Sequence, residues 1–529
     1  MAEISSNTEV FVYTEGVVVP EDVARVRVHP SITIIPENTF YKRQKLKEVE
    51  LCEGLLEIGS HAFFDCEELT EIRIPSTVTI IHEKAFFDCF SLQQVEFCEG
   101  LREIRSAAFC CYHLRRICLP NSVEHIGDEV FMSCRVFQFR TPPLITTISS
   151  GMICHTESTY SIELPESIAQ IEETALEYCE CLRNVAIPPN AWIQYDAFNC
   201  CTDLYQLFET QAQLINALKH RFDKLPIHKM IYYQSYNNVT LDQLTNALDM
   251  RSGQRRSART KLDQTGNKPD CLGMTPLHIL ACSTVQNIDL YKVLVHKYPE
   301  NLVAEDRWGA VPLLYAIWGG APVEIVRYLV ESYKSLYPDY ELNWEEMMLT
   351  LGRADVDYDV IIKLSRMQEE SFPNQVMDWS VILKKAVTLW DDDQPGYINK
   401  TAFKHLVRRS FAARVKAIGL KHFWGEMSDK MHETNVGSSA QGRRDYIAKI
   451  HEELALCIDE YNRLKEATAL LELALWKKKM EDHWQEANEK RRIKRVKIEE
   501  IDLRKQCRVG SGADIVIGNV LRYLVTMKE

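Results

Sequence analysis

Cysteines are the first residues in this sequence whose type and spacing could do chemistry. Five of them recur at regular steps, each three residues after a large apolar side chain: Cys66, Cys89, Cys134, Cys179 and Cys201. Several thiolates together could bind zinc, but structural zinc sites usually take C-x-x-C pairs, which neither this series nor the doublets at 110–111 and 200–201 supply. The spacing therefore favours buried, free thiols in a reducing, intracellular setting, and we predict neither a metal nor a cofactor.

A second candidate for chemistry is the acidic segment LWDDDQPGYIN, which resembles the start of a calcium loop through Asp391, Asp393 and Gly396. Pro395 stands where such a loop has an oxygen ligand, and Ala402 stands where it has a bidentate glutamate, so we interpret the segment as a helix cap and turn. The sequence contains no G-x-x-x-x-G-K-[ST], G-x-S-x-G, H-E-x-x-H or G-x-G-x-x-G motif. We therefore predict a protein that is not an enzyme.

Charge is unevenly distributed along the 529 residues, whose formal net charge is −13. Residues 1–204 carry 15 basic and 31 acidic side chains, which disfavours nucleic acid and acidic membranes as partners of this part. No uncharged apolar run reaches the roughly 18 residues of a membrane span, and the N-terminus lacks the features of a secretory signal. We expect an intracellular protein without a membrane partner, located in the cytoplasm, with the nucleus as the alternative.

The elements that must position these residues form a repeat. An isoleucine recurs every 22 or 23 residues, at Ile35, Ile58, Ile81, Ile104, Ile126, Ile148, Ile171 and Ile193. Five positions later stands a large apolar residue: Phe40, Phe63, Phe86, Phe109, Phe131, Ile153, Leu176 or Phe198. A fixed period of this size indicates a solenoid, in which each unit buries its apolar face against its neighbours. We predict a solenoid with a parallel β ladder over residues 25–205, preceded by a cap or extension at 1–24.

The units resemble BspA-type leucine-rich repeats. The pattern L-x-x-I-x-x-x-A-F-x-x-C-x-x-L-x-x-I-x-I-P of that family is met almost completely at 55–75. The pattern weakens at 137–160, where the chain is expected to bulge or to open a loop. The resemblance implies a leucine-rich-repeat solenoid and binding to other proteins.

Charged residues of the predicted strands should form a ladder on the exposed face of the sheet. This candidate protein-binding face comprises Arg27, Glu50, Arg73, Glu96, Arg140 and Glu163. Because the first four alternate in sign at the usual strand separation of about 4.8 Å, they could neutralise one another and fix the register. The alternative is a charged recognition face. Replacing Glu50 by Lys should lower stability under the first interpretation.

Residues 206–390 have helical spacing and resemble ankyrin repeats. Thr275-Pro276-Leu277-His278 resembles the T-P-L-H opening of such a repeat, and related copies lie at 307–317 and 225–233. The resemblance implies that His278 and His228 serve turns between repeats and are not catalytic or metal-binding residues. Between two copies, the basic segment 249–270 is predicted to be a mobile loop, in which Ser257 is a candidate phosphorylation site.

The rest of the chain is predicted to be helical, with a connector at 391–440, a long helix at 441–509 and a docking helix at 510–529. Apolar residues at alternating steps of four and three give 450–475 a coiled-coil-like seam. Its members include Ile450, Leu454, Tyr461, Leu464, Leu471 and Leu475. Such a helix either docks on its own repeats or pairs with another chain, including a second copy.

A basic cluster lies within the long helix and comprises Lys490, Arg491, Arg492, Lys494, Arg495 and Lys497. It could be a nuclear import signal or contact phosphates, but no aromatic residue lies among the basic ones, so a solvated helix face is favoured and we do not expect nucleic acid as a partner. The whole assembly is similar to large families of repeat proteins in diatoms, a resemblance that supports the architecture and carries no assigned activity. We predict a non-catalytic protein-interaction scaffold; the alternative is a nucleus-associated regulator.

Overall fold

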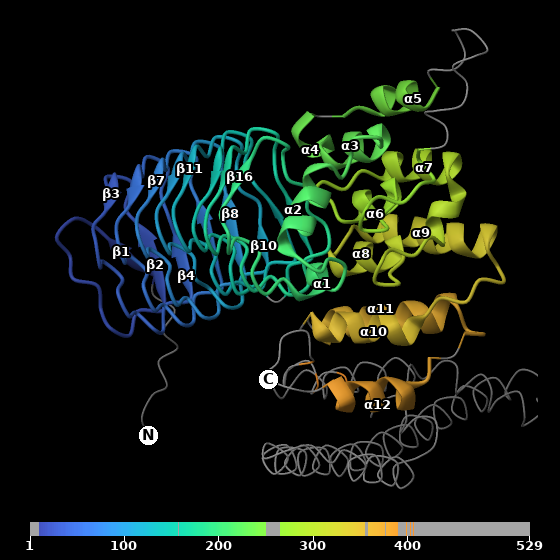
Figure 1. Cartoon of the computed structure of the whole chain (residues 1–529). Coiled ribbons are helices and arrows are strands. Elements are labelled where there is room, and N and C mark those ends of the chain that lie inside the picture. The colour runs from blue at the N-terminus through green and yellow to red at the C-terminus, as the bar shows by residue number, and fades with distance from the viewer. Residues whose placement is uncertain are drawn as a thin grey trace, which may run out of the picture. The chain divides into compact units, whose positions relative to one another are not determined.

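The computed structural model describes residues 10–156, 158–237, 239–249, 265–354, 358–375 and 377–389, together with Ile398, Phe403 and Leu406. In Figure 1 the β coils follow one another from left to right and are succeeded by helices, all within one compact unit that spans Met1–Met431. The predicted order of a parallel β solenoid followed by a helical region is confirmed.

Most coils of the solenoid contribute one strand to each of two rows, called the longer and the shorter strands. The longer strands are β1 (Phe11–Tyr13), β2 (Arg25–Val28), β4 (Glu48–Glu50), β6 (Glu71–Ile74), β8 (Gln94–Phe97), β10 (Arg116–Ile117), β12 (Gln138–Arg140) and β14 (Ser161–Glu163). Strand β10 belongs to the longer row by its pairing, although it has two residues. They pair in parallel within three sheets, β1-β2-β4, β6-β8-β10 and β12-β14. Strand β1 lies in the segment 1–24, for which only a cap or extension is predicted. It pairs with β2 and is an additional strand of the first sheet.

The shorter strands form a second row on another side of each coil. They are β3 (Ile34–Ile35), β5 (Glu57–Ile58), β7 (Ile80–Ile81), β9 (Glu103–Ile104), β11 (His125–Ile126), β13 (Thr147–Ile148), β15 (Gln170–Ile171) and β16 (Trp192–Ile193). Strands β3 to β11 form one parallel sheet, and β13, β15 and β16 form another. Both rows are therefore interrupted where the coil that contains β12 and β13 begins.

The solenoid core is a column of stacked side chains. All eight residues of the large apolar position, from Phe40 to Phe198, are fully buried. The rings of Phe40, Phe63, Phe86 and Phe109 stack with centroids 4.8–5.0 Å apart. Stacking of this kind adds to the burial of apolar area that holds neighbouring coils together. The shared hydrophobic interior predicted from the repeat is confirmed.

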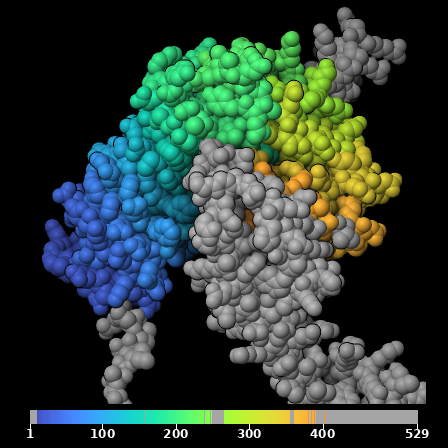
Figure 2. Space-filling model, turned by 60° about the horizontal axis from the view of Figure 1, so that its bottom comes forward, coloured from blue at the N-terminus to red at the C-terminus, as the bar shows by residue number. Residues whose placement is uncertain are grey.

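The helical region begins directly after the last coil. Its helices are α1 (Thr202–Tyr205), α2 (Gln211–Lys219), α3 (Pro226–Tyr232), α4 (Gln234–Asn237), α5 (Leu241–Asp249), α6 (Pro276–Ala281), α7 (Ile288–Lys297), the 3₁₀ helix η1 (Pro299–Leu302), α8 (Pro312–Trp318), α9 (Val323–Leu336), α10 (Trp344–Arg353), α11 (Tyr358–Ser371) and α12 (Trp379–Leu389). The space-filling surface runs without a visible break from the last coils to these helices (Figure 2). Within the described part of the chain, no helix combines the length and apolar character needed to cross a bilayer.

Two units of the helical region share the same turn. Asp270 accepts hydrogen bonds through Oδ1 from the N–H groups two and four residues ahead, and Asp306 does the same 36 residues later. Each turn contains a glycine with positive φ, Gly273 at 80° and Gly309 at 73°, and leads to a helix that begins with proline. The turns thus repeat as the sequence spacing suggested, while the assignment to ankyrin repeats stays a prediction.

Candidate interaction surface

The first four members of the candidate protein-binding face lie exposed on the longer strands. Arg27 and Glu50 form an ion pair at 2.6 Å across β2 and β4, and Arg73 and Glu96 form one at 3.4 Å across β6 and β8. All four side chains are more than half exposed, so each pair contributes at most about 1 kcal/mol. Two of the three neighbouring pairs of a self-neutralising ladder are therefore present, and no ion pair joins Glu50 to Arg73 among the described residues. Whether a partner binds this face stays a prediction.

The expectation that the exposed ladder continues through Glu163 is wrong. Glu163 is 1% exposed, because α4 and the loop after α6 cover β14. Its carboxylate accepts hydrogen bonds from the Ser235 hydroxyl and from the Thr284 N–H, both at 2.7 Å, and burial raises its pKa. A residue expected to meet a partner instead anchors the chain's own helices to the solenoid.

Arg140 is also drawn into this contact. It is half-buried, and its Nη2 donates to the Ser235 carbonyl at 3.2 Å. Its guanidinium lies 4.4 Å from the ring centroid of Tyr236, a cation–π distance. The exposed part of the candidate face is consequently limited to the coils before β12.

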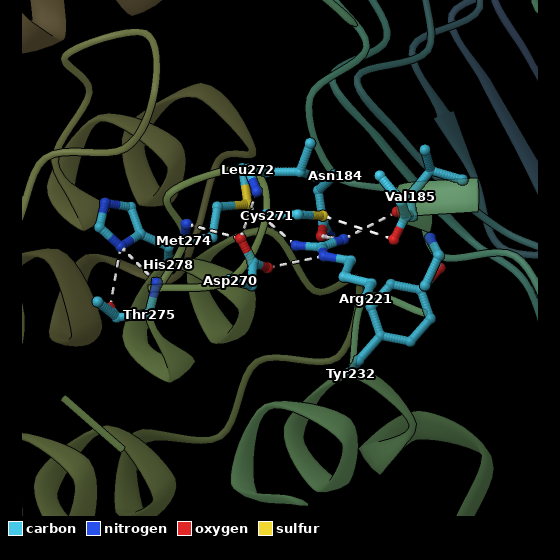
Figure 3. A network of polar contacts seen from close by, with 12 residues as sticks. Asn184, Val185, Arg221, Tyr232, Asp270, Cys271, Leu272, Met274, Thr275 and His278 are labelled. Atoms are coloured by element: carbon cyan, nitrogen blue, oxygen red, sulfur yellow. Dashed lines mark hydrogen bonds and ion pairs between the residues drawn. The ribbon is translucent and has the colours of Figure 1, made fainter. Parts of the chain in front are cut away.

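A buried ion pair fastens the last coil to the helical region. The Arg221 guanidinium, from the loop after α2, lies between the Asp270 carboxylate on one side and Asn184 and Val185 on the other (Figure 3). Its Nε donates to Asp270 at 2.7 Å, and its Nη1 donates to the Asn184 side chain at 2.8 Å and to the Val185 carbonyl at 2.9 Å. Arg221 and Asp270 have fully buried side chains. The pair thus joins segments that are far apart in sequence.

A second buried cluster lies at the same junction. Asp203 of α1 accepts from Arg183 of the last coil at 2.6 Å and from Arg353 of α10 at 3.0 Å. The Arg183 guanidinium also lies 5.1 Å from the Trp308 ring centroid. Because a buried charge without a partner is very costly, these pairs tie the orientation of the helices to the solenoid.

The hydroxyl of Tyr232 caps the edge of β14. It accepts hydrogen bonds from the N–H groups of Leu164 and Ala186 and donates to the Ile162 carbonyl at 2.9 Å. Strand edges with unpaired backbone groups are aggregation sites in many sheets. The helical region therefore serves as the C-terminal cap of the solenoid.

These junction residues were missed by sequence reasoning, although one signal was present. The pattern D-x-x-G-x-x-P-L occurs at 270–277 and again at 306–313. A recurring aspartate at a fixed distance before each helix could have been recognised as a turn residue. Nothing in the sequence indicated that Arg221 would be its partner.

The regularly spaced cysteines are buried free thiols, as predicted. Each donates to the carbonyl of the large apolar residue in the preceding coil, with sulfur–oxygen distances of 2.9–3.3 Å. Burial raises the pKa of the Cys179 thiol to about 12, which keeps it protonated and able to donate. The thiols therefore pair backbone carbonyls between coils, a role that the sequence did not reveal.

His278 and His228 occupy equivalent positions in α6 and α3 but differ in their partners. Thr275 and His278 form a capping box at the start of α6, and the His278 Nε2 lies 3.0 Å from the Ala310 carbonyl of the next unit. This contact agrees with the turn role expected for His278. In α3 the N-cap is Leu225, which makes no side-chain cap, and neither ring nitrogen of the buried His228 has a hydrogen-bond partner among the described residues.

A Leu225→Thr substitution is therefore expected to stabilise the protein by about 1 kcal/mol, since a threonine hydroxyl can cap the helix and reach His228. Chemical unfolding of the full chain measures the change. Thr275→Leu is the matched control and should lower stability by a similar amount. A loss of stability in Leu225→Thr would contradict the equivalence of the two helix starts.

Several sequence predictions lie outside the described residues. They are the coiled-coil seam Ile450, Leu454, Tyr461, Leu464, Leu471 and Leu475, the basic cluster 490–497, Ser257, and the acidic segment around Asp391. The mobile loop falls largely outside them as well, and the connector almost entirely. Self-association through the tail and a nuclear role consequently stay predictions.

Comparison with known proteins identifies the repeat. The family model "BspA type Leucine rich repeat region" matches residues 33–153 and 133–246, with six copies. A leucine-rich repeat protein of T. pallidum is 26% identical, with 33% of this chain and 82% of that one covered and a TM-score of 0.29. One from Bacteroides ovatus is 23% identical, with 36% and 52% covered and a TM-score of 0.29.

One from Eubacterium ventriosum is 18% identical, with 34% of this chain and 59% of that one covered and a TM-score of 0.26. The chain thus spans only about half the length of the last two. No match was found among curated proteins. The β coils up to residue 193 thus match the BspA-type leucine-rich repeat model, whereas the end of the matched range forms the helices that follow Cys201.

Proposed function

We propose that the chain is a non-catalytic scaffold that binds another protein through the exposed coils of its solenoid. The observation that carries this proposal is the division of the longer-strand face into two parts. Strands β2 to β8 present exposed charged side chains, whereas β12 and β14 carry the chain's own helices. A solenoid whose end is capped in this way offers a rigid surface beside the cap.

Buried titratable groups at the junction between the solenoid and the helices form hydrogen bonds and ion pairs within the protein. They are therefore not available as catalytic groups, which agrees with a binding role. Glu163 is engaged by Ser235 and Thr284, and Asp270 by Arg221. Perturbed groups in structural networks of this kind are a known alternative to catalytic sites.

A charge swap on the exposed face tests the proposal. The double variant Arg73→Glu with Glu96→Arg keeps the ion pair and the net charge, so its stability should change by no more than about 0.5 kcal/mol. A partner that reads the order of charges should nevertheless bind it more weakly. The measurement is the yield of cross-links from a photoreactive residue placed at the exposed Gln94 of the full chain, followed by mass spectrometry.

The matched control places the same photoreactive residue at Glu83, which is exposed in a turn outside the longer-strand face. Cross-links to one protein from position 94 that are weak at position 83 and fall in the charge-swap variant would support the proposal. Equal yields from both positions, or a yield that the swap leaves unchanged, would show that this face is not the binding surface.

A further inference from the structure

The two ends of the solenoid differ in how they are covered. At the C-terminal end, Tyr232 of the helical region caps the edge of β14. At the opposite end, β1 is the outermost strand of its sheet and pairs on one side with β2 (Figure 1). A sheet edge without such a cover is a place where a further strand can be added.

The backbone of β1 offers unpaired groups along its outer edge. The His29 N–H donates to the Tyr13 carbonyl at 2.9 Å, so the backbone groups of Tyr13 face β2. Because successive residues of a strand point their N–H and C=O groups to opposite edges, those of Val12 point away from β2. No described strand lies on that side, and the Thr14 N–H has no backbone partner among the described residues. A further strand could therefore pair with Val12 and Thr14.

The outward side chains of β1 are apolar where later strands carry charges. Val12 lies opposite Arg27 of β2. In the coils that follow, the same position is occupied by Glu50, Arg73 and Glu96. Val12 is 46% exposed, and Val10, two residues before it on the same face, is 39% exposed. Since charged side chains protect sheet edges against association, valines in their place leave this edge open.

The other sheet that ends at this coil has a proline at its edge. In the following coils, the residue after the shorter strand donates its N–H to the preceding coil, as Gly59 does to the Ile35 carbonyl at 2.9 Å. His82 and Arg105 do the same. The equivalent residue after β3 is Pro36, which has no N–H. Proline at an edge removes a donor that an added strand would need, so a further strand is expected at β1 and not at β3.

The charges around β1 decide what kind of strand fits. Residues 10–24 contain no lysine or arginine, and their acidic residues are the exposed Glu15, Glu21 and Asp22. On β2, Arg27 is neutralised by its ion pair and Arg25 is half-buried. A second copy of this chain would bring the same acidic residues to the contact. A strand with basic residues would instead be attracted to it.

We propose that the outer edge of β1 binds an extended segment of another protein, one that combines β-branched residues with flanking lysines or arginines. The segment would accept hydrogen bonds from the N–H groups of Val12 and Thr14, donate one to the Val12 carbonyl and pack side chains on Val10 and Val12. In such strand addition, main-chain hydrogen bonds give affinity and the alternating side chains give specificity. The proposal goes beyond the charged face of β2 to β8, because it uses other groups and stands even if that face has no partner.

Fluorescence anisotropy of labelled, capped heptapeptides mixed with the full chain tests the site. The probe is Lys-Val-Thr-Val-Thr-Val-Lys, and Glu-Val-Thr-Val-Thr-Val-Glu is the control of reversed charge. At low salt, where screening is weak, we expect the lysine peptide to bind about tenfold more tightly or better. The variant Glu15→Gln with Glu21→Gln should reduce this preference.

Val12→Pro removes the outward N–H and leaves the pairing with β2 intact, so it should weaken binding of the lysine peptide about tenfold or more. Val12→Thr is the matched control, because it keeps the N–H and the β-branched shape, and its affinity should stay within about twofold of the natural chain. Both variants should keep the far-ultraviolet circular dichroism of the natural chain. Arg73→Glu with Glu96→Arg should leave the affinity within about twofold, since the charged face is a separate surface.

The proposal is overturned if the lysine peptide does not bind at about 1 mM, or if Val12→Pro binds it as tightly as Val12→Thr. Sedimentation velocity of the natural chain and of Val12→Pro examines the remaining occupant. A dimer that Val12→Pro dissociates would also overturn the proposal, because the edge of β1 would then bind a second copy.

Discussion

An Asp270→Asn variant is expected to lose about 3–5 kcal/mol of unfolding free energy, because it leaves the Arg221 charge buried without its counter-charge. The substitution keeps the shape of the side chain and one acceptor oxygen for the turn. It places an amide in the position where Arg221 now donates at 2.7 Å, so that two donors can face each other. Chemical unfolding of the full chain, followed by circular dichroism, measures the loss.

Asp306→Asn is the matched control, since Asp306 makes the same turn hydrogen bonds in the next unit. Its second oxygen accepts from the Tyr315 hydroxyl, which can rotate to accept from an amide. We expect a loss of roughly 1–2 kcal/mol there. Glu96→Ala, which breaks an exposed pair, should cost no more than about 1 kcal/mol.

The same experiment shows whether the solenoid and the helices unfold together. Arg221 contacts Asn184 and Val185 of the last coil as well as Asp270. If these contacts couple the two parts, Asp270→Asn should lower the stability of both the β and the helical signal. A loss confined to the helical signal, or one no larger than in Asp306→Asn, would contradict the coupling role assigned to the buried pair.

The positions that sequence reasoning placed correctly are those fixed by neighbours one period away. Phe63 packs between Phe40 and Phe86, each 23 residues distant, so the spacing alone identifies the stack. The charged pairs Arg27–Glu50 and Arg73–Glu96 follow from the same period. In a solenoid each unit contacts chiefly the adjacent units. Residues one period apart in the sequence are therefore expected to pack against each other.

The positions that sequence reasoning misplaced are those fixed by distant segments. Glu163 continues the ladder by spacing, but Ser235 and Thr284, 72 and 121 residues away, cover it. Arg221 and Asp270 have no periodic relation that would mark them as a pair. The repeat alone predicts an exposed Glu163, but the helical region packs on β14 and buries it. The sequence does not indicate which strands the helices cover.

The bulge or loop expected at 137–160 is not what the structure shows: the coil keeps strands β12 and β13, and the irregularity is a break in the ladder between β11 and β13. Backbone hydrogen bonds join every other pair of neighbouring shorter strands, but none is found between β11 and β13 in the described solenoid. The gap at β11 and β13 is therefore a property of contacts between coils that residue types alone do not disclose.

Acid is expected to destabilise the protein through His228. Burial lowers the pKa of its ring to about 4, from 6.5 in the unfolded chain. Protonation of the buried His228 ring is less favourable in the folded chain than in the unfolded chain. The free energy of unfolding therefore has its full value above about pH 6.5 and decreases as the pH falls toward 4. The loss should reach about 2 kcal/mol at pH 5, relative to pH 7.5.

A His228→Leu variant isolates this effect, since a leucine fills a similar volume and binds no proton. As the pH is lowered from 7.5 to 5, the natural chain should lose about 2 kcal/mol more unfolding free energy than the variant. Other titrating groups, including the buried His278, whose pKa burial also lowers, are common to both chains and cancel in the difference. If both chains lose stability in parallel over this range, the ring of His228 is not the group that binds the proton, and the absence of a hydrogen-bond partner on its nitrogens has no consequence for acid stability.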